Sequence, residues 1–405
     1  MAKQPKTVKP IGRRDVLRFG GVGVGAAAVG SWSLASAALH AQSAAPAGTM
    51  ATSDPAHDRT VRFTGDGLSL TPAQSAHVLA RLTEGGVVPD DYILGGVVEA
   101  LETRMAALLG KDRAVLLPTG TLANHLAIRA LAGGRGRAVV QAESHIYLDS
   151  GDCVQTLSGV TLMPLAPGRA TFTADDLQQL LERNRTGRVA TPIGVVSIES
   201  PVRRMRGQVF ESGALDAAIA LARKDGIRLH LDGARLFLEA AYANRPVADY
   251  ARPFDTVYVS LYKYFNAPFG AMLAGPRDLL DGMYHTRRMF GGGLYQAWPA
   301  AALALHYLDG FTERYRRAIA VSEDLIARLA ADGRFTIARE PHGTNLLRLT
   351  PKTTDPKAYR ERLFARGVAL GAPGATGAFL LATNETLNRA SADRLARTFT
   401  DALAS

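Results

Sequence analysis

The feature that most constrains the fold of this 405-residue chain is a regular alternation of short apolar runs with helix-like stretches. Apolar runs of strand length lie at 114–118, 138–144, 160–165, 193–200, 227–232, 256–262 and 270–275. Between several of these runs the apolar residues follow helical spacing, over 121–133, 172–184 and 214–226. Strands that are apolar throughout and separated by helices form a mostly parallel sheet that is covered on both faces. The sequence therefore predicts an α/β fold, with a large domain over residues 61–305.

The last hundred or so residues have a different pattern. Here the helical stretches are longer, and strand-like runs occur at 344–350 and 378–383. A chain of this length commonly forms more than one domain. We therefore expect a smaller C-terminal α/β domain over residues 306–405.

The first 41 residues have the layout of a secretory signal, with a basic front, an apolar Ala/Gly-rich run and small residues at the end. The paired Arg13 and Arg14 ahead of the apolar run resemble a twin-arginine export signal. We expect cleavage after Ala41, a flexible linker over 42–60, and a mature protein in the periplasm or outside the cell. An uncleaved membrane anchor is the alternative interpretation.

The charge balance limits the classes of partner. The chain carries a net charge of +10, of which residues 1–41 supply +5. The remainder is only mildly basic and has no Lys/Arg block interleaved with aromatic residues, so we expect no nucleic-acid partner. Cys153 is the only cysteine, so no intramolecular disulfide can form. The absence of a disulfide fits a protein that folds around a cofactor before export. We also expect no stable membrane insertion after cleavage of the signal, and no metal site.

Polar residues follow four of the predicted strands, where ligands bind in open parallel sheets. In "LPTGTLANH", Gly120 and Thr121 open a helix whose free N–H groups suit a phosphate. His145 in "ESHIYL" and Lys263 in "VYVSLYKYFNAPFG" each come just after a strand. In "RLHLDGARLF", the buried strand ends in Asp232, whose carboxylate is costly to bury without a partner. A lysine in an apolar setting has a lowered pKa and becomes a nucleophile toward carbonyl groups.

These residue types match the needs of one cofactor, pyridoxal phosphate (PLP). It requires a lysine for a Schiff base, a carboxylate at its pyridinium nitrogen and an anion site for its phosphate. A carboxylate there keeps the ring nitrogen protonated, so that the ring can accept electrons from the substrate Cα. The order phosphate turn, histidine, aspartate and lysine is more specific than any single motif.

On these motifs, together with "RRMFGGGLYQA", the chain resembles the threonine aldolase / aromatic amino acid β-eliminating lyase family, which has fold type I of PLP enzymes. The resemblance covers roughly residues 62–385. It implies that Lys263 forms the Schiff base, Asp232 pairs with the pyridine nitrogen and His145 stacks on the ring. It also implies a homodimer or homotetramer. The remaining implied contacts are Gly120, Thr121 and Arg288 of a neighbouring subunit at the phosphate, and Arg235 at the cofactor and the substrate carboxylate.

The activity implied by the resemblance is cleavage of the Cα–Cβ bond of a 3-hydroxy-amino acid to glycine and an aldehyde. Three positions depart from the family pattern. Val202 replaces a histidine that faces the substrate hydroxyl, Phe379 or a neighbour replaces a second carboxylate-binding arginine, and Tyr295 replaces a basic phosphate contact. Because valine cannot take a proton, that role passes to His145 or to water, or is absent.

Basic residues have appeared instead in "SPVRRMRG", as Arg203, Arg204 and Arg206. Arg203 and Arg204 are candidates for substrate binding, and a solvated basic loop is the alternative. We expect the native substrate to be an amino acid other than threonine. PLP-dependent β-elimination, racemisation and a catalytically altered PLP-binding homologue stay open, as does a generic α/β protein with a structurally paired Asp232.

Overall fold

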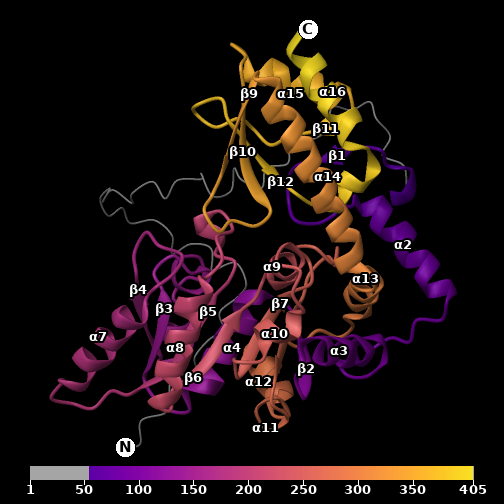
Figure 1. Ribbon diagram of the computed structural model, residues 1–405. Coiled ribbons are helices and arrows are strands. Elements are labelled where there is room, and N and C mark those ends of the chain that lie inside the picture. Colours follow the sequence, from indigo (N-terminus) through magenta and orange to yellow (C-terminus); the bar gives the residue numbers. More distant parts are fainter. Residues whose placement is uncertain (1–53, 405) are drawn as a thin grey trace, which may run out of the picture. The chain divides into compact units, whose positions relative to one another are not determined.

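The computed structural model describes residues 54–404 (Figure 1). The predicted signal peptide over 1–41 and most of the predicted linker lie outside this range. The described chain contains a seven-stranded sheet, a three-stranded sheet and a two-stranded pair. The seven-stranded sheet carries the predicted site.

The seven-stranded sheet confirms the mostly parallel arrangement expected from the sequence. Its strand order is β2, β8, β7, β6, β5, β3, β4, and β8 alone runs in the direction opposite to the other six. The bounds are β2 Arg113–Leu117, β3 Arg137–Gln141, β4 Thr161–Leu165, β5 Ile193–Glu199, β6 Arg228–Asp232, β7 Thr256–Ser260 and β8 Ala271–Gly275. The carboxyl ends of β2, β3, β5, β6 and β7 therefore lie along one edge of the sheet.

Helices cover both faces of this sheet, because alternate residues of each strand point to opposite sides. On β2, Leu116 belongs to one apolar cluster with α3, α8, α9 and α13, whereas Leu117 belongs to another with α4 and α12. The helices of this part are α3 Gly96–Leu109, α4 Gly120–Ala132, α5 His145–Leu148, α6 Cys153–Ser158, α7 Ala174–Arg185, α8 Ser212–Lys224, α9 Leu236–Tyr242, α10 Val247–Ala251, α11 Arg277–Leu280, α12 Met283–Met289 and α13 Trp298–Leu308. Both layers are needed to bury strands that are apolar on each face.

The second predicted strand, at 138–144, corresponds to β3 and ends earlier than expected. The Ser144 hydroxyl donates to the Gln141 carbonyl at 2.7 Å, which closes a turn after β3. His145 then opens the short helix α5. A local side-chain hydrogen bond of this kind competes with strand pairing. As a result His145 opens a short helix four residues after β3, instead of coming directly after the strand.

The C-terminal part has its own apolar core and its own sheet, in the order β12, β10, β9, with antiparallel pairing. Its elements are α14 Phe311–Asp332, β9 Phe335–Arg339, β10 Leu346–Pro351, α15 Pro356–Ala365, β11 Val368–Ala369, β12 Phe379–Ala382 and α16 Ala392–Ala404. The sequence did not indicate β9, whose five residues include only one that is buried. A strand with so little buried surface leaves no apolar alternation to read.

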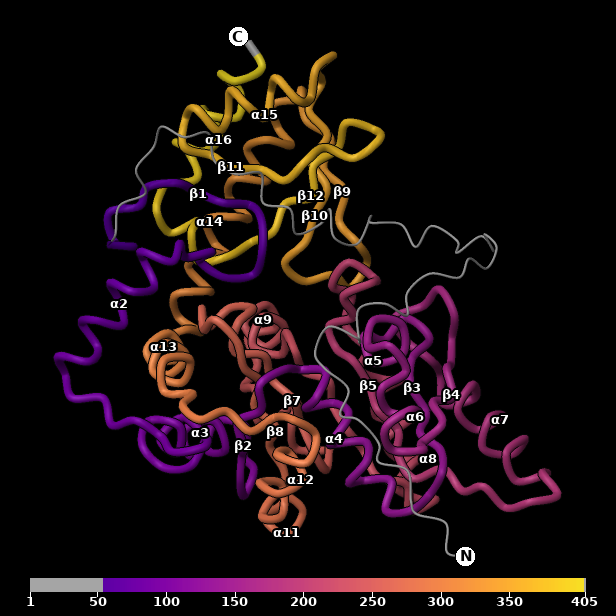
Figure 2. Tube along the Cα trace, turned by 180° about the vertical axis from the view of Figure 1, so that it is seen from behind, coloured from indigo at the N-terminus to yellow at the C-terminus, as the bar shows by residue number. Residues whose placement is uncertain are grey.

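The first residues of the described chain join this C-terminal core. Strand β1, Val61–Arg62, pairs in parallel with β11, and Val61 and Phe63 are buried in the C-terminal cluster. Figure 2 shows β1, in indigo, beside the late strand β11. Residues 61–63, which the sequence assigned to the large domain, therefore pack with the small one.

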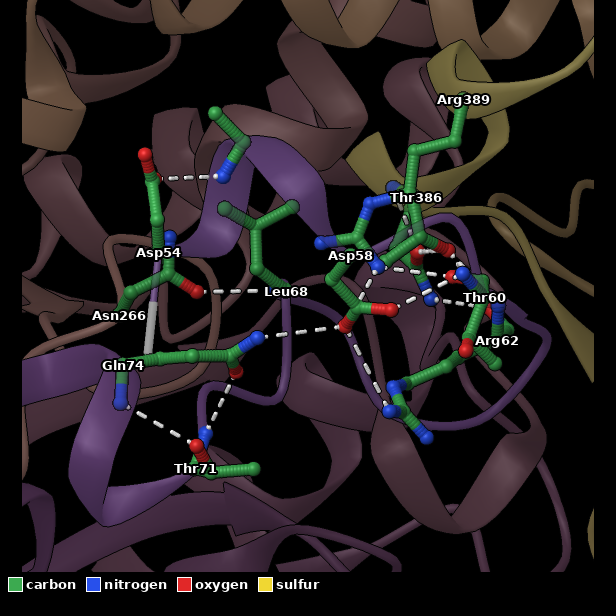
Figure 3. A network of polar contacts seen from close by, with 12 residues as sticks. Asp54, Asp58, Thr60, Arg62, Leu68, Thr71, Gln74, Asn266, Thr386 and Arg389 are labelled. Carbon is green, nitrogen blue, oxygen red and sulfur yellow. Dashed lines mark hydrogen bonds and ion pairs between the residues drawn. The ribbon is translucent and has the colours of Figure 1, made fainter. Parts of the chain in front are cut away.

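A polar network holds the segment between η1, Pro55–His57, and α2, Pro72–Glu84 (Figure 3). Asp58 forms ion pairs with Arg389 at 3.1 Å and Arg62 at 3.6 Å, and its carboxylate accepts from Gln74 at 3.4 Å. Further along, the Leu68 amide donates to Asn266 at 2.8 Å. Residues 54–60, assigned to the flexible linker, are thus held by capping and ion pairs.

Candidate active site

Three acidic or phenolic side chains lie side by side at the edge where the parallel strands end. Glu199 on β5 is in register with Asp232 on β6, which is in register with Tyr258 on β7. Residues in register on adjacent strands share a face of the sheet. This face packs against α4, since a Cβ added to Gly120 would lie 2.0 Å from the Tyr258 hydroxyl oxygen. The predicted strand ends therefore converge as the sequence indicated.

Asp232 is held by a buried chain of hydrogen bonds that sequence reasoning missed. Its Oδ2 accepts from the Asn124 side-chain amide at 2.6 Å, and its Oδ1 accepts from the Ala234 backbone amide at 3.1 Å. The Asn124 oxygen lies 2.9 Å from His230 Nε2, and His230 Nδ1 lies 2.8 Å from the Thr256 hydroxyl. The side chains of all four residues are buried.

The donors and acceptors available on each side chain fix the direction of every hydrogen bond in this buried series. Asn124 must donate its NH₂ group to a carboxylate, so its oxygen accepts from His230 Nε2–H. His230 is then the neutral Nε2–H tautomer and accepts the Thr256 hydroxyl proton at Nδ1. Burial lowers the pKa of His230 to about 4, which keeps the ring neutral. Both donors to Asp232 are uncharged, so its negative charge stays available to a cation.

Lys263 stands three residues after β7, near these carboxylates. Its side chain is half-buried, and its amine makes no hydrogen bond or ion pair with residues 54–404. Its Nζ lies 5.7 Å from the centroid of the Tyr262 ring. Burial and the neighbouring Arg235 guanidinium lower the pKa of Lys263 to about 8. A sizeable fraction of the amine is therefore uncharged and nucleophilic at mildly alkaline pH.

Glu199 is a second buried acid that the sequence reasoning did not count as a site residue. Its Oε2 accepts from the His145 backbone amide at 2.7 Å, and its Oε1 accepts from the Arg203 backbone amide at 2.9 Å. Burial and then the Asp232 charge raise the pKa of Glu199 to about 7. Glu199 thereby ties the segments that carry His145 and Arg203 to the end of β5.

Arg235 lies at the start of α9 and pairs with an acid from the N-terminal segment. Its Nε donates to Asp66 at 2.8 Å, and Asp66 also accepts from Asn345 at 3.0 Å. The two terminal nitrogens of the Arg235 guanidinium have no acceptor among the residues that the structure describes. They form one edge of a planar group that suits a carboxylate.

The structure gives Gly120 a different importance from the one expected. The helix-opening amides of Gly120 and Thr121 have no acceptor within residues 54–404, which fits an anion site. However, it is the closeness of the Tyr258 ring that requires a glycine at position 120. On the same face of β7, the buried Ser260 hydroxyl also lacks a partner in the described chain. Sequence reasoning missed Ser260, although a serine three residues before Lys263 was visible.

The remaining predicted residues have varied surroundings. His145 is half-buried, 3.4 Å from Asp149, and Arg204 pairs with that same Asp149. Arg203 is exposed, and its guanidinium has no partner among the described residues. Arg288 is exposed, with its guanidinium 4.8 Å from the centroid of the Tyr92 ring.

The three departures from the family pattern are accounted for by packing. Val202 is fully buried and its amide donates to Gln208, so an apolar residue fits that position. Phe379 belongs to the core of the C-terminal sheet, 6.1 Å from the Tyr359 ring. Tyr295 is exposed and packs its ring edge-on against Tyr92.

The donors at this site fit pyridoxal phosphate. Unpaired amides and a buried orphan hydroxyl suit a phosphate, a carboxylate with neutral donors suits a pyridinium nitrogen, and an unpaired amine suits an aldehyde carbon. The signal for the missed residues was present in the sequence, because Asn124 interrupts an apolar helix face and His230 alternates with Asp232. Only the pairing of α4 with β6 shows that these side chains meet.

Comparison with known proteins finds a threonine aldolase and an alanine racemase among the relatives. Over 212 residues the chain is 28% identical to a low-specificity L-threonine aldolase of Candida albicans, covering 52% of this chain and 56% of the relative. Over 207 residues it is 32% identical to an alanine racemase of Cochliobolus carbonum, covering 50% and 52%. The chain thus spans little more than half the length of these curated relatives.

Solved structures match over most of the chain. A protein from Exiguobacterium sp., described as an aromatic amino acid β-eliminating lyase/threonine aldolase, aligns with a TM-score of 0.72 at 22% identity, covering 86% of this chain and 98% of its own. A protein of Listeria monocytogenes, described as an L-allo-threonine aldolase, aligns with a TM-score of 0.68 at 25% identity, covering 85% and 96%. SPT solved with PLP aligns with a TM-score of 0.61 at 18% identity, covering 85% and 86%.

These likenesses agree with a match to a family model. The model is that of the beta-eliminating lyases, and it matches residues 80–350, which contain the four strand ends and every predicted site residue. Because the match covers more than half of the chain, this protein belongs to the beta-eliminating lyase family.

Proposed function

We propose that the protein is a PLP-dependent lyase that cleaves the Cα–Cβ bond of a 3-hydroxy-amino acid to glycine and an aldehyde. The observation that carries this proposal is the unpaired Lys263 amine, with its lowered pKa, beside the Asp232 carboxylate at the ends of neighbouring strands. The low-specificity threonine aldolase relative and the L-allo-threonine aldolase structure support the reaction type.

The residues that would hold the cofactor follow from the donors present. Lys263 would bond its aldehyde carbon, Asp232 would pair with its ring nitrogen, and His145 would stack on the ring. Gly120, Thr121 and Ser260 would hold the phosphate, and Arg288 of a neighbouring subunit would assist. When bound, PLP supplies an electron-accepting ring in conjugation with the substrate amino group.

The chain's own residues would then bind and orient the substrate. The free edge of the Arg235 guanidinium would donate to the substrate carboxylate, while Asp66 accepts from Nε on the other side of the group. The Asn124 amide fixes the Asp232 carboxylate and so keeps its charge toward the ring nitrogen. The uncharged Lys263 amine can take a proton from Cα and its charged form can return one, because a pKa of about 8 lets both forms exist near neutral pH.

The test of cofactor binding is the colour of the purified protein. We expect yellow wild-type protein, with a visible absorption band that Lys263→Ala abolishes and borohydride fixes on a peptide containing Lys263. The matched control is Lys224→Ala, which removes an exposed lysine on α8 and should keep the band. A colourless wild type that cannot be reconstituted with PLP contradicts the proposal.

A second outcome at the same site is favoured by two observations. Val202 cannot accept a proton, and one relative is an alanine racemase. β-Elimination or racemisation would use the same lysine and carboxylate. The products separate these reactions: glycine with an aldehyde indicates aldol cleavage, a keto acid with ammonia indicates elimination, and a mixture of enantiomers indicates racemisation. A loaded protein that yields none of these is a catalytically altered homologue.

The unpaired guanidinium of Arg203 supports a substrate with an acidic side chain. Arg203 lies four residues after Glu199 and is exposed, and its guanidinium has no partner in the described part of the chain. We expect Arg203→Gln to raise KM for 3-hydroxyaspartate and to leave KM for L-threonine unchanged. A strong preference of the wild type for L-threonine over bulkier and acidic 3-hydroxy-amino acids would count against this substrate class.

Export and assembly belong to the same proposal. We infer twin-arginine export from residues 1–41, and a homodimer or homotetramer from the resemblance. Among residues 54–404, no helix has the length and apolarity that a membrane crossing requires. Replacing Arg13 and Arg14 with lysine should keep the protein in the cytoplasm, and light scattering of the mature protein gives the subunit number.

A further inference from the structure

The three arginines of the basic run after β5, Arg203, Arg204 and Arg206, differ in their ion-pair partners. Arg206 donates from Nε to Glu340 at 2.5 Å, and Arg203 has no partner among the described residues. Arg204 grips Asp149 with two hydrogen bonds, from Nε at 3.0 Å and from Nη2 at 2.5 Å. Arg204 is thus already paired with a carboxylate, and its role as a substrate contact stays a prediction.

Asp149 in turn lies one helical turn after His145, with its Oδ2 3.4 Å from His145 Nδ1. Partial burial alone would raise the pKa of Asp149, but the hydrogen bonds and charge of Arg204 lower it overall. Asp149 is therefore an ionised carboxylate between an imidazole and a guanidinium. A carboxylate at Nδ1 favours the Nδ1–H tautomer and leaves Nε2 as the unprotonated nitrogen.

The buried Glu199 side chain holds the segments that carry His145 and Arg204 in place. The Glu199 carboxylate accepts the His145 amide with one oxygen and the Arg203 amide with the other, at 2.7 and 2.9 Å. The helix that carries His145 and the loop that carries Arg204 are therefore held to the same point of the sheet. The charged groups that face His145 are Asp149 from its own helix and Glu199 from β5, with Arg204 beyond Asp149 and Glu143 near Arg204.

We propose that Asp149 and Arg204 are positioning residues that orient His145 as the acceptor of the substrate hydroxyl proton, in place of the side chain that Val202 cannot supply. This rests on the proposed lyase function. In the step, the β-hydroxyl O–H bond breaks, its proton goes to His145 Nε2, and its electron pair forms the aldehyde C=O bond. The pair of the broken Cα–Cβ bond stays with the glycine fragment, which takes a proton at Cα.

The two positioning residues carry opposite charges and should act on His145 with opposite signs. Asp149→Asn removes a negative charge beside the imidazole, so the midpoint of its pH titration should fall by about one pH unit. Arg204→Gln leaves Asp149 uncompensated, so the same midpoint should rise by about half a pH unit. Arg204→Lys should restore the wild-type midpoint. A purely structural role would move both variants in one direction or neither.

The measurement is NMR of histidine labelled at ¹³Cε1 and ¹⁵N, on the full chain loaded with PLP and again before loading. His145→Gln assigns the signal, and Arg206→Gln is the matched control, because its ion pair with Glu340 does not contact His145. We expect Nδ1–H in the wild type and no change in the control. An Nε2–H tautomer, or equal midpoints in Asp149→Asn and Arg204→Gln, overturns the inference.

Product analysis separates this inference from the proposed function. If the wild type releases glycine and an aldehyde, the acid limb of its pH–kcat profile should move with the NMR midpoints of the two variants. Opposite NMR shifts without aldehyde formation would refute the lyase assignment and the proton transfer. Aldehyde formation with unmoved midpoints would refute only the role of Asp149 and Arg204.

Discussion

Replacing Asn124 with alanine tests the buried chain that holds Asp232. The change removes a hydrogen bond of 2.6 Å to a carboxylate and one of 2.9 Å from a histidine ring. A hydrogen bond to a charged group is worth about 1.5–3 kcal/mol, and leaving the His230 N–H buried and unpaired costs about 1–3 kcal/mol. Because these atoms are buried, solvent screening does not reduce either contribution. We therefore expect Asn124→Ala to lower the free energy of unfolding by about 3–5 kcal/mol.

The assay is urea denaturation of the full chain without added PLP, at one fixed protein concentration, because any ligand or subunit contact also changes apparent stability. The matched control is Asn388→Ala, which removes an exposed hydrogen bond to the Arg314 carbonyl. That variant should lose less than about 1 kcal/mol. An Asn124→Ala cost as small as the control cost would refute the reasoning.

A double-mutant cycle separates the shared hydrogen bond from general packing. His230→Ala also breaks the bond to Asn124 and leaves the Thr256 hydroxyl without its acceptor. Since the two single changes remove the same interaction, their combined cost should be smaller than the sum by about 1 kcal/mol or more. Strict additivity would mean that Asn124 and His230 do not act as one chain.

Three further outcomes follow from the geometry. Gly120→Ala should prevent the native approach of Tyr258, whose hydroxyl oxygen would lie 2.0 Å from the new Cβ. We therefore expect this variant to give less soluble folded protein, or to bind PLP more weakly in a titration. Ala130→Gly, on the same helix, should keep both the soluble yield and the PLP affinity. Burial raises the pKa of Glu239 to about 7 from an ordinary 4.5, so the folded protein loses stability as the pH rises through that interval. In Glu239→Gln the midpoint of urea denaturation should therefore change less between pH 4.5 and pH 8 than it does in the wild type. Arg235→Lys should raise KM for the amino acid substrate about tenfold or more, because an ammonium cannot hold Asp66 and a carboxylate in one plane; an unchanged KM would exclude Arg235 from carboxylate binding.

Local patterns were sufficient to place the sheet and the strand ends. The runs at 193–200 and 227–232 correspond to β5 and β6 within one residue, since a parallel sheet requires strands that are apolar on both faces. The same reasoning led to Asp232, which ends one such run, and to Lys263, which comes just after the apolar run 256–262. Strand β9 escaped it, since most of its residues are exposed.

The interactions between distant segments could not be read in this way. Asn124 and His230 are more than a hundred positions apart, and only the packing of α4 on β6 joins them. Arg204 is separated from Asp149 by 55 positions, so the basic loop gave no indication of which acid it would pair with. Val202 appeared as the loss of a proton acceptor, whereas its burial shows a position shaped for an apolar side chain.

The distribution of hydrogen-bond partners at this site bears on whether Asp232 is only a structural acid. Each of the three carboxylates has two donors: Asp232 from Asn124 and Ala234, Glu199 from two backbone amides, and Asp66 from Arg235 and Asn345. Lys263 is the exception, because its amine has no acceptor in the described chain although three acids lie near it. A chain under selection for stability alone would gain by pairing that amine with one of these acids. Holding Asp232 and Glu199 with neutral donors, and Asp66 with Arg235, instead leaves the Lys263 amine unpaired. This preserves a nucleophile with a lowered pKa, which covalent chemistry at this edge of the sheet requires.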